Sequence, residues 1–299
     1  MFKCLSPESL GISASPNELI EPALSYGFKG LELDVVAFAA QVEREGLPAA
    51  RRLLDSAKLK LAYFRLPLQL AADDAEFEPA FAKLKSYAKL AADLGCTRCV
   101  TQMAAADIRP LHQNFDFHRK RIITVAKLLE EYGIQLGIGF TATTDAEALG
   151  DFEFIRSFDG LGMLLSMCTA AKNVGVAVDL FDLWSCHASF DAVTNARMKT
   201  IVVFLADAPT GVEPEDALQN QRLLPGESGL IDSAAVLTAL AESGYDGPVV
   251  PLPHADRFKQ TGRQQIFKTT SEKLDQVWKS AGLSPAGKLV PLKAGQSAK

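Results

Sequence analysis

IVVFLADAP (201–209), RLLPGESG (222–229) and GYDGPVVPLP (244–253) follow one another in the last third of this chain. The first segment is an apolar, β-rich run that ends in a carboxylate and a proline, which indicates a buried parallel strand that delivers Asp207 to a loop. The third segment is typical of a turn followed by a second buried strand. Together they predict parallel strands that carry polar groups to one edge of a sheet.

Helix-like and strand-like segments alternate along the whole chain, which is the pattern of a parallel sheet wrapped by helices. Strands are expected at 2–5, 30–35, 60–68, 96–104, 134–140, 174–182, 201–206 and 248–252. Helices are expected at 16–26, 47–57, 76–94, 115–132, within 154–171, and at 190–197, 233–243 and 264–281. Eight βα units predict an α/β fold, a single-domain (β/α)8 TIM barrel. We expect the barrel to occupy residues 1–282 and a flexible tail to occupy 283–299, where periodicity is lost.

Composition narrows the function classes. The chain has 299 residues, 48% hydrophobic content and a net charge of −5, with no basic run in its body. Nucleic acid and anionic membranes are therefore not expected partners. No apolar run approaches the ~20 residues of a membrane span, and the start MFKCLSPESLG lacks the apolar segment of a secretory signal. A cytoplasmic location is expected.

Five cysteines are scattered along the chain, an odd set that does not form a disulfide framework. The CTRC motif at 96–99 opens a strand, whereas redox CxxC motifs lie at the start of a helix. Reduced, structural thiols are therefore expected.

In sequence and spacing, these segments resemble those of the xylose-isomerase-like TIM barrel superfamily, which contains sugar phosphate isomerases and epimerases. The resemblance covers most of the chain. The resemblance implies four divalent-metal ligands at the carboxyl ends of strands: Glu on the fifth, Asp on the sixth, His on the seventh and Glu on the eighth. It also implies that the two glutamates move a proton at the substrate carbon.

The residues of this chain depart from that pattern at the ligand positions. LGIGF places Gly139 at the position of the first glutamate, and VGVAVDLFD keeps Asp179 but has Asp182 where the family has a histidine. Phe204 stands at the strand-seven histidine and Leu252 at the last glutamate. One carboxylate binds a divalent ion weakly. The resemblance therefore implies a degenerate metal site with Asp179 as its remnant, and no cofactor is expected. Mn²⁺, Mg²⁺ or Zn²⁺ would bind only if the mapping is out of register.

Polar residues remain where the barrel mouth should be. Arg222 matches a family arginine that approaches the polar end of the substrate, and its planar fork suits phosphate or carboxylate. Glu32 and Arg65 end the second and third strands, and Gln102 lies on the fourth. The resulting set of expected substrate-binding residues is Arg222, Glu32, Arg65, Asp179 and Asp207. Each of them has a structural alternative, in an ion pair, a hydrogen-bond network or the fixing of a loop.

No Ser or Cys nucleophile signature, phosphate loop or dinucleotide motif is present. Loop side chains offer an alternative acid/base or metal set, and these catalytic candidates are Asp179, Asp182, His187 and His254. Asp179 and Asp182 lie close enough in sequence to share a proton at a strand end. His112 and His118 flank the fourth helix and are expected to be solvated.

Two hypotheses follow. The first is an isomerase or epimerase that acts on a small sugar or sugar-phosphate-like ligand, by residues other than the family's metal and two glutamates. The alternative is a non-catalytic TIM barrel that binds a sugar-like ligand or a protein partner. A homo-oligomer is compatible with both, and no symmetric interface can be identified in the sequence.

Overall fold

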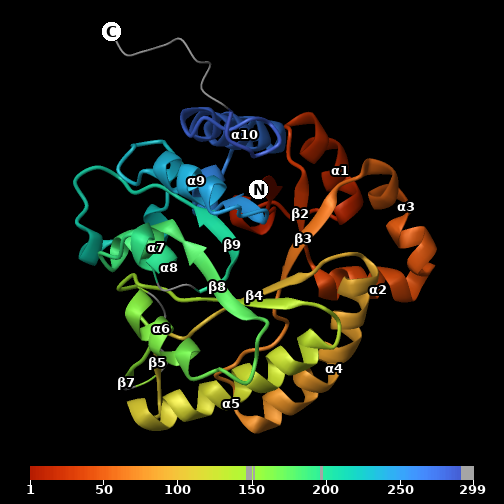
Figure 1. Ribbon diagram of the computed structural model, residues 1–299. Coiled ribbons are helices and arrows are strands. Elements are labelled where there is room, and N and C mark those ends of the chain that lie inside the picture. Colours follow the sequence, from red (N-terminus) through yellow and green to blue (C-terminus); the bar gives the residue numbers. More distant parts are fainter. Residues whose placement is uncertain (146–149, 151, 196–197, 291–299) are drawn as a thin grey trace.

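The computed structural model describes residues 1–145, 150, 152–195 and 198–290. Eight parallel strands close into a barrel in the order β1, β10, β9, β8, β6, β4, β3, β2, and helices surround it (Figure 1). This confirms the predicted single-domain (β/α)8 fold. The barrel strands are β1 (Phe2–Leu5), β2 (Gly30–Leu33), β3 (Lys60–Arg65), β4 (Arg98–Gln102), β6 (Gln135–Gly139), β8 (Val174–Asp179), β9 (Thr200–Leu205) and β10 (Pro248–Pro251).

The longer helices form the outer layer of the barrel (Figure 1). They are α1 (Pro16–Ser25), α2 (Val35–Glu45), α3 (Leu47–Ala57), α4 (Asp74–Asp93), α5 (Leu111–Glu130), α6 (Phe158–Ser166), α9 (Ser233–Glu242) and α10 (Arg263–Ser280). Shorter elements occur in the connections: α7 (Leu180–Ser185), α8 (Phe190–Asn195), the 3-10 turns η1 (Glu8–Leu10), η2 (Pro214–Asp216), η3 (Gln219–Gln221) and η4 (Ala255–Phe258), and the antiparallel pair β5 (Ala106–Asp107) and β7 (Phe152–Glu153). Among the described residues, no helix is both long and apolar enough to cross a bilayer.

Two helix starts near strand ends were not predicted. The second strand was predicted to end at Val35, but Asp34 caps α2 by accepting from the Ala37 backbone N–H at 2.9 Å, so that Val35 begins this helix. The predicted strand at 174–182 stops at Asp179, which caps α7 in the same way. In both places a carboxylate satisfies free N–H groups at a helix start, which overrides the strand preference of the flanking residues.

Side chains fill the interior of the barrel. The group comprises Phe2, Cys4, Ala62, Tyr63, Val100, Ala177, Ile201, Val202, Phe204 and Val250. Tyr63 and Phe204 meet edge to face with ring centroids 5.8 Å apart. A large ring is accommodated by a small neighbour: a Cβ built on Gly30 would lie 2.6 Å from the Phe2 ring. This is the packed interior typical of TIM barrels.

The start of the predicted tail is folded against the end of α10. The Trp278 indole N–H donates to the Ser284 carbonyl at 2.9 Å, and the Val290 N–H donates to the Gly282 carbonyl at 2.9 Å. Leu283 is buried. Residues 283–290 therefore have fixed partners, and the rest of the predicted tail lies outside the described residues.

Candidate functional site

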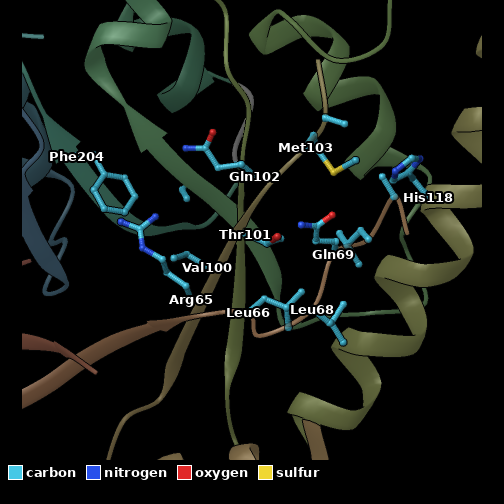
Figure 2. A pocket seen from close by; sticks show the side chains of 14 residues that line it. Arg65, Leu66, Leu68, Gln69, Val100, Thr101, Gln102, Met103, His118 and Phe204 are labelled. Atoms are coloured by element: carbon cyan, nitrogen blue, oxygen red, sulfur yellow. The ribbon is translucent and has the colours of Figure 1, made fainter. Parts of the chain in front are cut away.

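A cavity of about 370 Å³ opens at the carboxyl ends of β3 and β4. Figure 2 shows Phe204 and Arg65 on one side of it and His118, from α5, on the other. Val100, Ala177 and Phe204 from the barrel interior contribute to its apolar surface. Polar side chains also line the cavity. The polar lining residues are Arg65, Gln69, Thr101, Gln102 and His118. An apolar floor with hydrogen-bonding walls is the ordinary composition of a small-molecule site.

Glu32 and Arg65, both predicted to bind substrate, are paired with each other at the rim. Arg65 Nε donates to Glu32 Oε1 at 2.7 Å and lies 3.1 Å from Glu8 Oε2. The other oxygen of Glu32 accepts from the Tyr63 hydroxyl at 2.9 Å and from Ser6 Oγ. Burial, with the Glu32 charge, raises the pKa of Tyr63 well above its usual value, so the phenol remains a donor. Glu32 is thus held by three side chains, while the Arg65 side chain, which lines the cavity, is still 41% exposed.

Asp179, Asp182 and Arg222 form a buried ion cluster, which we call the aspartate–arginine cluster. Arg222 donates from one terminal nitrogen to both oxygens of Asp179, at 2.9 and 2.8 Å, and from the other to Asp182 Oδ2 at 2.8 Å. Its Nε donates to Gln219 Oε1 at 2.7 Å. The three charged side chains are at most 5% exposed. Every nitrogen of the guanidinium therefore has a partner inside the protein.

Backbone groups fix the two aspartates in turn. Asp179 Oδ1 accepts from the Phe181 N–H at 2.9 Å at the start of α7, and Asp182 Oδ1 accepts from the Ala142 N–H at 2.9 Å after β6. Burial raises the pKa of Asp182 to about 6, Arg222 opposes that change and the neighbouring Asp179 charge adds to it. The cluster thus ties the ends of two strands to the loop that carries Arg222.

A smaller cavity of about 220 Å³ lies over this cluster and shares Arg65 and Gln102 with the first. Arg222 and His254 are among its lining residues. If Arg222 contacts a ligand, as predicted from the sequence, it does so in this smaller cavity. Its charge is already neutralised there by Asp179 and Asp182.

Asp207, the remaining predicted binding residue, is fully buried and accepts four backbone hydrogen bonds. Its Oδ1 accepts from Ala208 at 2.9 Å and Ile231 at 3.0 Å, and its Oδ2 from Ser228 at 2.9 Å and Gly229 at 2.7 Å. Both carboxylate oxygens are used in closing the loop after β9, which is the structural alternative considered for this residue.

The two loop histidines do not join the aspartates. His187 is exposed and its Nε2 lies 3.0 Å from Glu215 Oε2, while His254 accepts from the Asp256 N–H at 3.3 Å and begins η4. The His254 N–H also donates to the Arg222 carbonyl at 3.1 Å, which supports the arginine loop. Across residues 1–145, 150, 152–195 and 198–290, no group of three or more His, Cys, Asp or Glu side chains is placed to hold a metal ion.

The three apolar residues at strand ends also lie at this rim. In the barrel register Gly139 pairs with Gln102, and Phe204 pairs with Asp179 and with Val250. A Cβ built on Gly139 would lie 3.2 Å from the Ala177 carbonyl oxygen, a tight contact with backbone. Leu252 packs against the interior group that contains Phe204.

His118 was predicted to be solvated, and this is wrong: the side chain is fully buried and lines the larger cavity. It is the eighth residue of α5, on the face that packs on the barrel, and its ring lies 4.8 Å from that of Phe154. The signal in the sequence was its position in the apolar stripe that also contains Ile122 and Val125, both buried.

Burial lowers the pKa of His118 to about 4 from the usual 6.5. The unfolded chain therefore takes up a proton at a higher pH than the folded chain, so the stability present above pH 6.5 is lost as the pH falls towards 4. We expect His118→Phe to remove this loss, which amounts to as much as about 3 kcal/mol. Urea unfolding from pH 7 to pH 4 measures it. His112→Phe, at an exposed site on the same helix, is the control, and equal pH profiles for both variants would contradict the expectation.

Comparison with known proteins assigns the chain to a family. The family model described as xylose isomerase-like TIM barrel matches residues 20–275. The chain therefore belongs to the xylose isomerase-like TIM barrel family, as the sequence resemblance implied. Among curated protein sequences no match is found.

Solved structures of similar fold cover nearly the whole chain. A xylose isomerase domain protein from Alicyclobacillus acidocaldarius is 24% identical, with 94% of this chain and 99% of that chain covered and a TM-score of 0.83. The IOLI protein, solved with a zinc atom, is 13% identical over 94% and 98% of the two chains, with a TM-score of 0.77. D-Psicose 3-epimerase from Clostridium cellulolyticum H10, solved with D-tagatose, is 13% identical over 94% and 99%, with a TM-score of 0.70. At these identities the likeness concerns the fold.

Proposed function

We propose that this protein binds a small sugar-like ligand in the cavity at the carboxyl ends of β3 and β4, without the family's divalent metal and paired glutamates. The observation that carries the proposal is the aspartate–arginine cluster: the carboxylates of Asp179 and Asp182 are already neutralised by the guanidinium of Arg222. A divalent ion would have to displace a buried, multiply hydrogen-bonded cation.

The donors around Asp179 do not fit a metal site. The neighbouring strand ends supply Gly139, Phe204 and Leu252, none of which has a side chain with an oxygen or nitrogen ligand. Mg²⁺, Mn²⁺ and Zn²⁺ sites in proteins are built from oxygen, nitrogen or thiolate ligands. No catalytic step through a metal is therefore derived for this chain.

The cavity suits a carbohydrate-like molecule. The Phe204 ring and the aliphatic side chains of Val100 and Ala177 offer an apolar surface to the C–H groups of a sugar, and Thr101 and Gln102 offer hydroxyl and amide groups to its O–H groups. One relative of this fold was solved with D-tagatose and another in the presence of D-fructose. These two sugars are the first ligands to test.

NMR of the protein with D-fructose or D-tagatose in D₂O, with and without Mn²⁺, tests the proposal. We expect ligand-induced shifts of the Gln102 side-chain amide, no dependence on Mn²⁺, and loss of binding by about tenfold in Gln102→Ala, the order of one or two hydrogen bonds. Gln113→Ala is a useful control, because Gln113 is exposed on α5 and does not line the cavity. Metal-dependent binding, or calorimetric uptake of a stoichiometric Mn²⁺ ion, would overturn the proposal.

A metal-independent proton-transfer enzyme is the second candidate. It is favoured by Asp182, because a buried carboxyl with a pKa raised to about 6 is suited to exchange protons near neutral pH. Deuterium incorporation at carbon in the same NMR samples, abolished by Asp182→Asn, would favour this candidate, whereas binding without incorporation favours the non-catalytic barrel.

A further inference from the structure

A third cavity, of about 690 Å³, opens beside the site described above, and both the loop after β1 and helix α2 line it. It shares Arg65 and Leu66 with the cavity at the carboxyl ends of β3 and β4, and it shares Glu8 and Arg65 with the smaller cavity. The three cavities therefore meet at the Arg65 side chain, which is 41% exposed. A molecule bound at β3 and β4 can extend past this side chain into the third cavity.

The walls of this third cavity, which we call the proline groove, are largely apolar. Three half-buried prolines line it, namely Pro7, Pro16 and Pro67. A proline has no N–H to donate and its ring fixes the backbone torsion φ, so these residues present rigid apolar surface. Val36 also lines the groove and is 46% exposed. The other large apolar lining residues, all buried, are Ile12, Leu19, Leu33, Val35 and Leu66.

Polar side chains on the walls of the groove already have partners. Asp34 accepts from the Ala37 N–H at 2.9 Å, and Ser15 Oγ donates to Glu18 Oε2 at 2.8 Å. Glu32 is held by three side chains, as described above. A polar group would therefore gain few hydrogen bonds here, whereas an apolar group gains from the removal of its surface from water. The groove favours an apolar occupant.

One wall of the groove is a regular helix. Two helices, α2 and α3, follow β2 before the chain enters β3 (Figure 1). Ala37, Gln41 and Arg44 all line the groove, and their spacing of four and three residues places them on one face of α2. Because the Asp34 cap fixes the start of this helix at the end of β2, the wall is formed before a ligand binds.

We infer that the proline groove binds an apolar, ring-sized substituent of the same ligand whose polar part occupies the cavity at β3 and β4. The ligand is then an amphiphilic conjugate, such as a sugar that carries an aromatic group, and is larger than a free monosaccharide. This inference rests on the proposed function and names the second half of its ligand. The volume of the groove lies within the range of about 300–1,000 Å³ of small-molecule pockets and accommodates an aromatic ring with its linker.

Methyl and benzyl β-D-fructopyranoside are a matched pair of ligands for the test, because they share the sugar and differ in the apolar group. We expect the benzyl compound to bind at least tenfold more tightly, since its ring leaves water in the groove. In NMR spectra both compounds should shift the side-chain amide of Gln102, and only the benzyl compound should also shift the methyl groups of Val36.

Two variants of α2 separate binding in the groove from binding elsewhere. Ala37→Trp fills the groove from an exposed helix position, so it should abolish the tenfold preference and leave the affinity for the methyl compound unchanged. Ala40→Trp is the matched control, because Ala40 is exposed on the same helix and does not line the groove. It should keep the preference. The unchanged affinity for the methyl compound also shows that each variant is folded.

The outcomes are distinguishable. Equal binding of the two compounds to the wild type, or a preference that persists in Ala37→Trp, overturns this inference. The proposed function still stands in either case if the methyl compound or D-fructose shifts the Gln102 amide. If D-fructose, D-tagatose and both fructopyranosides leave that amide unshifted up to high millimolar concentration, the proposed function fails and the inference fails with it.

Discussion

Arg222→Ala is expected to lower the free energy of unfolding by about 3–5 kcal/mol at pH 7. The substitution leaves the carboxylates of Asp179 and Asp182 buried next to each other, with no cation between them. The penalty comes from the two unpaired charges, more than from any net attraction that the intact cluster provides. Urea unfolding of the two proteins measures the difference.

The pH dependence identifies the cause. Burial already raises the pKa of Asp182, and Arg222 opposes that change, so removal of Arg222 raises the pKa of Asp182 further. The variant should therefore regain stability relative to the wild type as the pH falls from 7 to 5, because Asp182 becomes neutral. Addition of Mn²⁺ should also stabilise this variant, and not the wild type, since two bare carboxylates then face one another.

A matched control is available on a neighbouring surface. Arg257 pairs with Glu227 at 2.6 Å, but both side chains are about 30% exposed. Arg257→Ala should cost about 1 kcal/mol or less, because solvent screens the pair. A similar small loss for Arg222→Ala, or a deficit that does not change with pH, would contradict the role assigned to the aspartate–arginine cluster.

Asp207→Ala is the second large expected effect, with a loss of at least about 3 kcal/mol in the free energy of unfolding. Four backbone N–H groups, from Ala208, Ser228, Gly229 and Ile231, lose a charged acceptor in a single substitution. Two of these donors, Ala208 and Ile231, are buried, so water does not readily replace the carboxylate.

The loop after β9 should loosen before the barrel unfolds. We expect faster amide hydrogen exchange at 228–231 in Asp207→Ala, measured by NMR or mass spectrometry, in addition to the lower unfolding midpoint. Asp232→Ala is the control: Asp232 caps α9 through one exposed bond to the Ala235 N–H, so about 1 kcal/mol is expected. If the two substitutions have equal effects, Asp207 does not organise the loop.

Periodicity was sufficient to predict the barrel, because each strand is a short apolar run and each helix has one apolar face. Strand ends were predicted less well. The β3 strand ends at Arg65 instead of continuing to 68, and α2 was missed because its first residues, Val35 and Val36, favour a strand when considered alone. The start of α2 is decided by a hydrogen bond that the Asp34 carboxylate accepts from the Ala37 N–H, and hydropathy does not record such a bond.

Site residues illustrate a different limit. The sequence identified Glu32, Arg65, Asp179 and Arg222 as polar groups at the mouth, but their partners depend on three-dimensional proximity. Arg222 and Asp179 are 43 positions apart in the chain. His118 was missed because a histidine in a helix has no sequence feature, apart from its place in the apolar stripe, that indicates burial.

The aspartate–arginine cluster constrains how this barrel can evolve. Any lineage in which Asp179 and Asp182 come to hold a divalent ion must first replace Arg222, and the intermediate carries two bare, buried carboxylates. A side chain added at position 139 would place its Cβ 3.2 Å from the Ala177 carbonyl oxygen, so the backbone of β8 would have to shift slightly to admit a new ligand there. The Arg222 guanidinium thus serves as a cation that the gene itself encodes. Its replacement by a metal ion would require several substitutions together.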